Sequence, residues 1–257
     1  MAQPRVLILR APGTNCDLET AYAFELAGGL AERWHVNRLL EYPRAVNDFQ
    51  ILCLPGGFSY GDDIAAGRIL GRQIRHHLAG AMAEFKAAGK LILGICNGFQ
   101  ILLKSGLLLP PDECGEVATL AANAGGRFVD RWVNLAVCGQ KAVCFAGIER
   151  MELPIAHAEG QFVVRDRETL DRLERGGQLV LRYCGAAGER PAPPGANPNG
   201  SQADVAGACD ETGRVCGLMP HPERHIDRTH HPRWTRQAHA EAGDGLAVFQ
   251  NAVRYFC

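Results

Sequence analysis

The segment from Leu91 to Leu102 contains a cysteine at a position where it could act as a nucleophile. An apolar run, Leu91–Ile95, ends at Cys96, glycines stand two residues before and after it, and a second apolar run follows. This pattern is typical of a strand, a tight turn and a helix, with the nucleophile at a corner where flanking side chains would clash. The amino end of the helix would favour the reactive thiolate. A lone cysteine is more often a buried core residue, but this spacing favours Cys96 as a nucleophile.

His221 and Glu223 could supply the base that such a nucleophile needs. They follow a predicted strand at 215–219, and the prolines on either side of His221 keep its backbone extended. Residues two apart in an extended segment project to the same side, so Glu223 could accept a hydrogen bond from one imidazole nitrogen while the other faces the thiol. A histidine in a loop more often bonds to backbone. Together with Cys96, however, the pair predicts a Cys–His–Glu triad.

Acyl transfer also requires hydrogen-bond donors for the oxyanion. A predicted strand at 49–54 ends in a glycine-rich turn that contains Gly57. Such a turn at the carboxyl end of a strand can expose backbone N–H groups toward the crevice in which open α/β sheets bind ligands. Most turns of this composition are only turns. Beside a nucleophile, the backbone N–H groups of Gly57 and Asn97 are the predicted oxyanion hole.

These motifs resemble the class I (triad) glutamine amidotransferases. Within that family, the resemblance points to the branch that serves purine biosynthesis. The stretches that carry the resemblance span nearly the whole chain: Gly13–Asp17, Gly56–Asp62, Gly94–Gln100, Pro154–Gly160, Asn197–Ser201 and Met219–Arg224. The stretches Asp63–Arg68, 185–195 and Arg224–Gly243 depart from the family pattern, as does Ala158, which stands where the family has glycine. None of these departures touches the predicted triad.

The resemblance implies hydrolysis of L-glutamine to glutamate and ammonia. It places Phe58, Gln100, His157 and Glu159 near the glutamine. The ammonia would pass to a separate ATP-dependent synthetase subunit, PurL, which usually acts with a small accessory subunit, PurS, in the amidation of formylglycinamide ribonucleotide. ATP and Mg²⁺ are therefore expected on the partner, and no cofactor or metal is expected in this chain. No loop of the Gly-x-x-x-x-Gly-Lys-Ser/Thr type is present in the sequence.

Composition predicts a cytoplasmic enzyme. The chain has 257 residues and a net charge of −1, which predicts no general attraction to nucleic acid or membrane surfaces. No apolar run approaches the ~20 residues of a membrane-spanning helix, and the amino end leads directly into a predicted strand. Ten cysteines are present, none in a Cys-x-x-Cys pair. Several lie in apolar runs, as Cys53, Cys138 and Cys144 do, which favours buried thiols over disulfides or zinc ligands.

The order of predicted elements indicates an α/β fold. In the first half, predicted strands at 5–10, 31–37, 49–54 and 91–95 alternate with predicted helices at 18–27, capped by Asp17, at 69–88, and after Cys96, ending near Gly106. This alternation predicts a flavodoxin-like open, mostly parallel sheet with helices on both faces. The second half is predicted to be strand-rich, with strands at 131–137, 143–145, 161–164, 178–183, 205–208 and 215–219. Because the nucleophile and the base lie in different halves, residues 1–257 are predicted to form a single domain.

Three other functions are compatible with parts of the sequence. The first is a metal-binding hydrolase that uses His221, Glu223 and His225 with His230 and His231, whose side chains suit zinc. The second is a non-catalytic regulatory or scaffolding subunit with the same fold. The third is a redox protein similar to DJ-1, which shares the cysteine corner but does not account for His221 and Glu223. The segment 224–243 is rich in arginine and histidine and is predicted to be a solvated or partner-facing arm.

Overall fold

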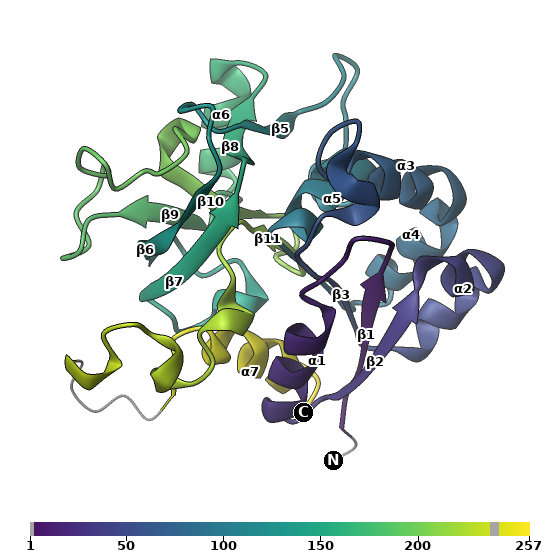
Figure 1. Ribbon diagram of the computed structural model, residues 1–257. Helices are drawn as coiled ribbons and strands as arrows, with labels where there is room; N and C mark the ends of the chain where they lie inside the picture. The colour runs from purple at the N-terminus through teal and green to yellow at the C-terminus, as the bar shows by residue number, and fades with distance from the viewer. Residues whose placement is uncertain (1–2, 237–241) are drawn as a thin grey trace.

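The computed structural model describes residues 3–236 and 242–257, which contain a nine-stranded sheet (Figure 1). The strand order is β2-β1-β3-β4-β11-β10-β9-β6-β7, and β5 and β8 form a separate antiparallel pair. The strands are β1 Arg5–Arg10, β2 Leu30–His35, β3 Ile51–Leu54, β4 Leu91–Ile95, β5 Ala118–Ala122, β6 Val129–Val137, β7 Arg150–His157, β8 Glu159–Val164, β9 Leu181–Cys184, β10 Val205–Cys209 and β11 Val215–Leu218.

Five neighbouring strands, β2, β1, β3, β4 and β11, are parallel. Every residue of β3, β4 and β11 is buried, as expected for parallel strands covered on both faces. The α-helices are α1 Asp17–Leu26, α2 Val36–Glu41, α3 Arg68–His77, α4 Ala79–Ala87, α5 Asn97–Ser105, α6 Arg167–Arg175 and α7 Leu246–Arg254. In the strand order, the chain moves from β1 through α1 to β2 in one direction. From β3 through α3 and α4 to β4, and onward through α5, it moves in the other direction. Right-handed crossovers therefore place these helices on opposite faces.

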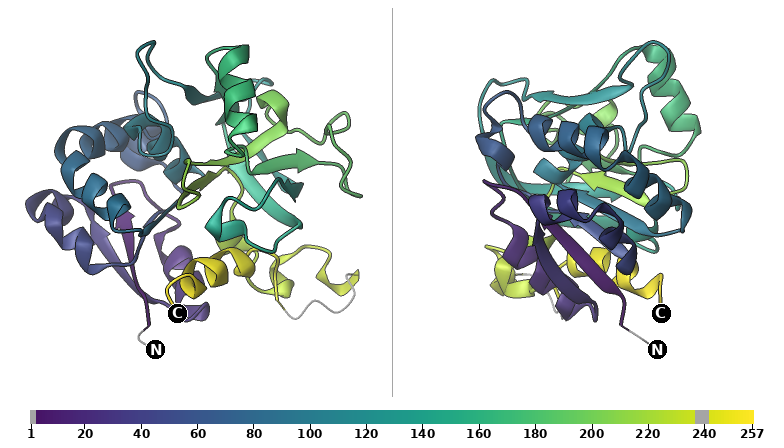
Figure 2. Two further views of the ribbon diagram at one scale, coloured as in Figure 1. Left: turned by 180° about the vertical axis from the view of Figure 1, so that it is seen from behind. Right: turned by 90° about the vertical axis from the view of Figure 1, so that its right-hand side faces the viewer.

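The strand-rich half continues the same sheet. Strands β10, β9, β6 and β7 extend it beyond β11, and each pairs antiparallel with its neighbour. Figure 1 shows this half on the left and the parallel half with α2–α5 on the right, and the view from behind in Figure 2 shows the same division. The predicted mostly parallel α/β sheet with a strand-rich addition is confirmed. Because β11 lies beside β4 and parallel to it, the segments that follow these two strands begin at the same edge of the sheet.

The ends of several predicted elements are shifted, so that the strand predicted at 31–37 ends at His35, where α2 follows, and the strand predicted at 178–183 begins at Leu181. Three further predictions differ from the structure. The stretch Val143–Phe145 is a short 3₁₀ helix (η3) packed against α7, not a strand, since a buried apolar run of three residues is compatible with either. The helix predicted at 69–88 is divided at Leu78 into α3, which packs on α5, and α4, which packs on another 3₁₀ helix, η1 (Pro43–Asp48). Asp17 does not cap α1 with its side chain. It is the first helical residue, and its carboxylate lies 3.0 Å from the guanidinium of Arg33.

The sequence analysis did not predict β5, β7, α2, α6 or α7. Strand β7 alternates buried and partly exposed residues, a two-residue period that indicates a strand. Pro154 within it argues against a central strand, but β7 is at the edge of the sheet, where a missing N–H donor is tolerated. Of the cysteines predicted to be buried, Cys53 and Cys144 are buried and Cys138 is half-buried. None of the helices in the described part of the chain combines the length and apolar character needed to cross a bilayer.

Candidate active site

Cys96 lies at a strained corner between β4 and α5. Its backbone has φ 51° and ψ −105°, a conformation that non-glycine residues rarely adopt. The corner is held by a 2.8 Å hydrogen bond from the Cys96 N–H to the carbonyl of Leu218, at the end of β11. A Cβ atom on Gly94 would lie 2.6 Å from the Gly98 oxygen, and one on Gly98 would lie 1.8 Å from the Leu54 oxygen. Only glycine therefore fits on either side of this cysteine.

His221 and Glu223 follow β11 and form a buried pair. His221 Nδ1 lies 2.7 Å from Glu223 Oε1, and both residues are 2% exposed. The His221 N–H donates to the carbonyl of Pro154 in β7, which fixes the backbone at this point. The other ring nitrogen, Nε2, has no hydrogen-bond partner among the described residues. His221 and Cys96 line the same cavity, so Nε2 is available for the reaction at the thiol.

The charge of Glu223 controls the protonation of His221. Burial by itself lowers the pKa of His221, but the nearby Glu223 and Cys96 charges raise it, and the net pKa is well above the usual range. The imidazolium form is therefore retained at neutral pH. A protonated histidine beside a thiolate is the state in which the sulfur attacks and the ring donates a proton to the leaving group.

The two predicted oxyanion donors lie on either side of the cysteine corner. Gly57 follows β3 with φ 137°, and a Cβ there would lie 2.7 Å from the Asn15 nitrogen. The side chain of Asn97 joins the two segments, because its Oδ1 accepts a 3.2 Å hydrogen bond from the Ser59 N–H. Within residues 3–236 and 242–257, neither the Gly57 nor the Asn97 N–H has a hydrogen-bond acceptor. Two free donors next to the nucleophile suit an oxyanion.

A cavity of about 230 Å³ opens beside Cys96 and contains all four residues that the resemblance placed near a substrate. Its walls are Gly57, Phe58, Asp62, Ala66, Cys96, Gln100, Ala156, His157, Ala158 and Glu159. Gln100 donates a 2.6 Å hydrogen bond to the Glu159 carbonyl, and a Glu159 carboxylate oxygen accepts from the Ala66 N–H. Phe58 is 46% exposed at the rim.

Asp62 is an acidic wall residue to which the sequence analysis assigned no role, although it lies in a motif of the resemblance. Burial raises the pKa of Asp62 to about 6, and the nearby Glu159 charge adds to the increase. An ammonium group entering this cavity would meet two acidic side chains, Asp62 and Glu159. The cavity therefore suits a small molecule with a positively charged end.

Asn123 is a buried residue that the sequence analysis missed. Its Oδ1 accepts hydrogen bonds from the Gly160 N–H and from His157 Nδ1, both at 3.1 Å, and its Nδ2 donates to the His157 carbonyl at 2.8 Å. Because the amide oxygen can only accept, the proton of the neutral imidazole lies on Nδ1. Burial, with a contribution from the His221 charge, lowers the pKa of His157 to about 4. His157 is therefore neutral at pH 7. No sequence motif marked Asn123, which lies 34 residues from its partner.

We expect His157 to make stability depend on pH. The unfolded chain takes up a proton on this histidine below about pH 6.5, whereas the folded chain does so only near pH 4, so stability falls as the pH drops through this window. Relative to His157→Asn, whose amide can still donate to Asn123, the wild type should lose roughly 2 kcal/mol between pH 7 and pH 5 in urea unfolding.

The control for this experiment is His76→Asn, at an exposed position. Its pH profile should follow the wild type. Parallel profiles for wild type and His157→Asn would contradict the assignment of a buried neutral histidine.

A second cavity of about 220 Å³ lies on the His221 side of the nucleophile. It shares Gly57, Phe58, Cys96 and Ala156 with the first cavity and adds Asn15, Cys16, Phe128, Asp130, His221 and Arg224. The Arg224 guanidinium donates to Cys16 Sγ at 3.2 Å and pairs with Glu19 at 2.8 Å. Cys16 also belongs to a motif of the resemblance, but the sequence analysis assigned it no role.

In the described part of the chain, the histidines of the metal-site hypothesis do not form a group with His221: the rings of His225 and His231 lie 5.7 Å apart, both against Trp132. His225 Nδ1 lies 2.7 Å from the Glu152 carbonyl, and the His231 ring lies 4.3 Å from the Trp132 ring. The group that could hold a metal ion, among the residues that the structure describes, is instead Cys16, His221 and Glu223. The prediction that 224–243 forms a solvated or partner-facing arm is also partly wrong, because His225 and His231 are buried. Residues 237–241 of this segment lie outside the described residues.

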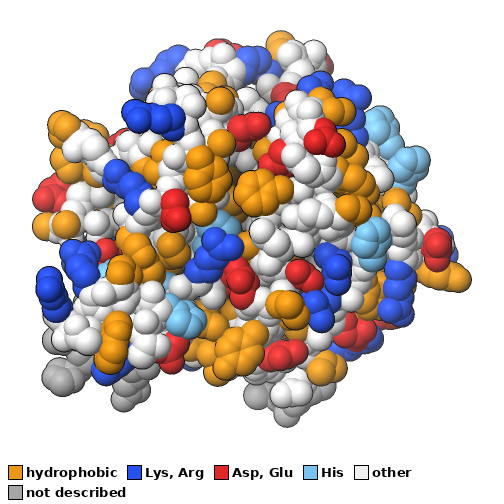
Figure 3. Space-filling view, in the orientation of Figure 1, with side chains coloured by type: hydrophobic (Ala, Val, Ile, Leu, Met, Phe, Trp, Pro, Cys, Tyr) orange, Lys and Arg blue, Asp and Glu red, His pale blue; other side chains and the backbone are white. Residues whose placement is uncertain are grey.

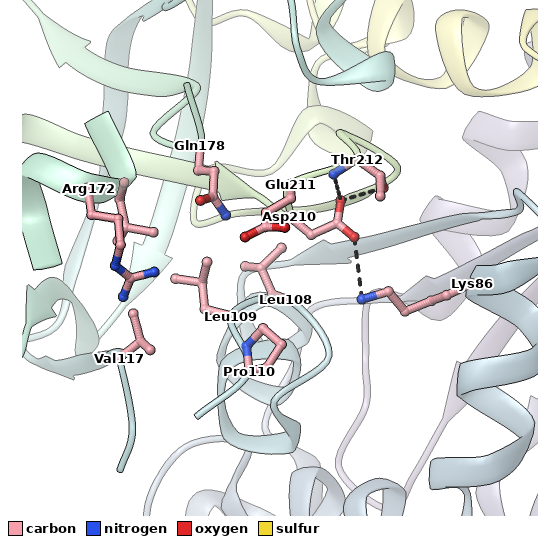
Figure 4. Close-up of a pocket in the computed structure, with 11 residues that line it drawn as sticks. Lys86, Leu108, Leu109, Pro110, Val117, Arg172, Gln178, Asp210, Glu211 and Thr212 are labelled. Atoms are coloured by element: carbon pink, nitrogen blue, oxygen red, sulfur yellow. Dashed lines mark hydrogen bonds and ion pairs between the residues drawn. The ribbon is translucent and has the colours of Figure 1, made fainter. Parts of the chain in front are cut away.

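A further cavity, of about 320 Å³, lies at the opposite end of the strands (Figure 4). Asp210 and Thr212 in its wall precede β11, whereas His221 and Glu223 follow β11 and Cys96 follows the parallel strand β4. Asp210 is held by Lys86 at 3.3 Å and by the Thr212 hydroxyl at 2.7 Å. Among the residues that the structure describes, the walls of this cavity contain no cysteine or histidine, so the cavity has no counterpart of the Cys96–His221 pair.

Comparisons with known proteins show the family that the chain matches. Residues 3–256 match the family model described as the CobB/CobQ-like glutamine amidotransferase domain. A Dehalococcoides mccartyi protein described as phosphoribosylformylglycinamidine synthase subunit PurQ is 46% identical over 99% of this chain and 98% of its own length. A Methanococcus maripaludis protein of the same description is 39% identical over 98% of this chain and 97% of its own length.

The fold of the chain also matches that of a solved structure. A chain in the structure of PurLQS from Thermotoga maritima superimposes with a TM-score of 0.75 at 32% identity. The match covers the whole of both chains.

Proposed function

The chain belongs to the CobB/CobQ-like glutamine amidotransferase family, and from this we propose that it is the glutaminase subunit of phosphoribosylformylglycinamidine synthase. The observation that carries the proposal is the buried His221–Glu223 pair, which shares a cavity with the strained Cys96 corner. The chain also covers almost the full length of relatives described as PurQ. The reaction of this subunit is the hydrolysis of L-glutamine to glutamate and ammonia.

The first half of the proposed reaction forms a thioester. Glutamine enters the cavity with its ammonium end toward Asp62 and Glu159, and its side-chain amide reaches Cys96. The thiolate attacks the amide carbon, and the N–H groups of Gly57 and Asn97 stabilise the oxyanion. The imidazolium of His221 then gives its proton to the nitrogen as the carbon–nitrogen bond breaks, so ammonia leaves and the acyl group stays on sulfur.

The second half releases glutamate. The now neutral His221 takes a proton from water as the water oxygen attacks the thioester carbon. The carbon–sulfur bond breaks and returns the thiolate, and His221 is again protonated beside Glu223. Glu223 keeps the tautomer of His221 fixed through the 2.7 Å contact with Nδ1. These steps use only side chains and backbone of this chain, so ATP and Mg²⁺ are expected on the synthetase subunit.

Ammonia that escapes into water at pH 7 becomes ammonium, which is not a nucleophile. We therefore propose direct delivery to the synthetase subunit, PurL, assembled with the accessory subunit PurS in the cytoplasm. Together the subunits would convert formylglycinamide ribonucleotide, glutamine, ATP and water to the amidine, glutamate, ADP and phosphate. The Thermotoga maritima structure is described as PurLQS, a name that combines PurL, PurQ and PurS and so supports these partners.

The experiment that tests the proposal measures glutamate release and amidine formation by the purified chain, alone and with PurL and PurS. Glutamate and amidine should form in a 1:1 ratio in the complete mixture, and hydrolysis by the isolated chain should be much slower. If this chain forms the complex, and supports amidine formation only from added ammonium salts, it is a regulatory subunit and the proposal is wrong.

We expect Glu223→Gln to lower kcat by about 10²–10⁴-fold. Without the carboxylate, burial dominates and the pKa of His221 falls, so the imidazolium that donates to ammonia is depleted as pH rises. The alkaline limb of the kcat profile should therefore move to lower pH. Glutamine hydrolysis from pH 6 to 9 by the complex measures both effects. Glu19→Gln, which removes a carboxylate that pairs with Arg224 and not with His221, is the control. A loss of rate with no shift of the limb would contradict this role of Glu223.

A further inference from the structure

Helix α3 carries three arginines on one exposed face. Arg68, Arg72 and Arg75 are separated by four and three residues, which places them on the same side of the helix. With His76, and with Lys104 from α5, they line a hollow of about 530 Å³, and Glu116 is the single acidic residue among the described residues of its wall. Figure 3 shows blue Lys and Arg side chains gathered at the upper right, over α3.

Two glycines bring these cations together. A Cβ on Gly67 would lie 2.8 Å from the Ile101 nitrogen, and one on Gly71 would lie 2.8 Å from Lys104 Cβ. The axes of α3 and α5 can therefore approach closely only because both positions lack a side chain. This close crossing places Lys104 beside the row of arginines, so the positive charge of two helices is concentrated in one hollow.

The arginines of this face have no partners within the described part of the chain. Arg68, Arg72 and Arg75 make no ion pair and no side-chain hydrogen bond there, whereas Arg5, Arg33, Arg165, Arg182, Arg224 and Arg233 each pair with a carboxylate. Like charges one helical turn apart repel each other. The chain as a whole has a net charge of −1, so this face is a local excess of positive charge. A negatively charged partner would relieve the repulsion.

The walls of the hollow suit an acidic protein surface better than a small ligand. The described residues that line it are all charged or titratable, and none of them offers an aromatic or aliphatic side chain on which a base could stack. All three arginines are exposed, and none of them makes a side-chain hydrogen bond to another described residue. Solvent-facing cations of this kind accelerate and orient protein association.

The position of α3 connects this surface to the active site. Ala66 lines the glutamine cavity, and α3 begins two residues later at Arg68. The Tyr60 hydroxyl lies 2.9 Å from Gln73 Oε1, so α3 is also tied to the loop that follows Gly57. We propose that the face formed by Arg68, Arg72, Arg75 and Lys104 docks an acidic surface of the synthetase subunit. This proposal rests on the proposed function, which supplies the partner.

The test compares two triple variants with the same change of net charge. In the first, Arg68, Arg72 and Arg75 are all replaced by glutamine. In the control, glutamine replaces Arg44, Arg175 and Arg254, which are exposed arginines on other elements. Affinity for purified PurL with PurS is measured at 50 and 300 mM NaCl, together with the association rate. The α3 variant should bind at least 10-fold more weakly at low salt, associate more slowly and depend less on salt. The control should remain within 2-fold of the wild type.

Each other outcome overturns the proposal. Equal affinities of the two triple variants, with a wild type that binds, would show that the subunits dock elsewhere while the proposed function stands. A wild type that does not bind PurL and PurS would overturn both. If millimolar inorganic phosphate or ATP stabilises the wild type but not the α3 variant, and the complex is unaffected, the hollow binds a small phosphate ligand. Because all three arginines are exposed, the α3 variant is expected to fold, and a thermal melt checks this.

Discussion

Replacing Cys96 by alanine should reduce glutamine-dependent amidine formation by about 10⁴-fold or more, while amidation with added ammonium salts continues. The alanine removes the sulfur at the corner between β4 and α5. Cys16 lines the same cavity, but its sulfur accepts a hydrogen bond from Arg224, and burial raises the pKa of its thiol, so we do not expect it to replace Cys96. Ammonium salts bypass the glutaminase step. The rate of amidine formation from these salts therefore shows whether the complex is still assembled and active. Glutamate release and amidine formation are measured in parallel.

The matched control is Cys114→Ala, because Cys114 is a free and exposed cysteine outside both cavities of the site. Its glutamine-dependent rate should equal that of the wild type. Glutamine hydrolysis that persists in Cys96→Ala would exclude the thioester mechanism. Loss of the ammonium-dependent rate as well would mean that the substitution disrupts the complex.

Replacing Gly98 by alanine should destabilise the fold by about 3 kcal/mol, the upper end of the usual cost of an overpacked core site, because the contact is with backbone and cannot easily relax. The added Cβ would lie 1.8 Å from the Leu54 carbonyl oxygen, which belongs to the buried strand β3. Either α5 or β3 must move, and both carry groups of the active site. Glutamine hydrolysis should therefore fall together with stability, as measured by urea unfolding and by activity at a temperature where the variant is folded.

Gly80→Ala is the matched control for this prediction. Gly80 lies in helix α4, and nothing lies within 4 Å of a Cβ built there. Alanine is the better helix former by up to about 1 kcal/mol, so this variant should be at least as stable as the wild type. Equal stabilities of Gly98→Ala and Gly80→Ala would show that the corner tolerates a side chain and is not tightly packed.

The elements of the parallel half follow from local signals in the sequence. The strands β3, β4 and β11 are short apolar runs because both of their faces are covered, and such runs are visible without knowledge of the fold. The corner at Cys96 is equally local, since it depends on two glycines within four residues of each other. For the same reason the Gly106 end of α5 was predicted, because a glycine there adopts the left-handed conformation that ends the helix.

The elements that were missed depend on contacts distant in sequence. The stretch Val143–Phe145 is buried because α7 covers it, and its short apolar run does not reveal whether the backbone is extended or helical. Strand β7 tolerates Pro154 only because it has no neighbour on that side of the nine-stranded sheet. The role of Asn123 depends on its hydrogen bond to His157, which lies 34 residues away in the sequence.

The sequence by itself determined the chemistry available to this protein: a nucleophile on a glycine-flanked corner, a histidine and a glutamate two residues apart, and the alternation of strands and helices. Only the tertiary structure decided which groups act together. Strand β11 pairs with β4 although the two lie in different halves of the chain, and this pairing brings His221 to the cavity of Cys96. The same is true of the Asn123–His157 contact and of the row of arginines beside Lys104. Periodicity and spacing reflect local backbone geometry, whereas strand order and helix crossing depend on packing between distant segments.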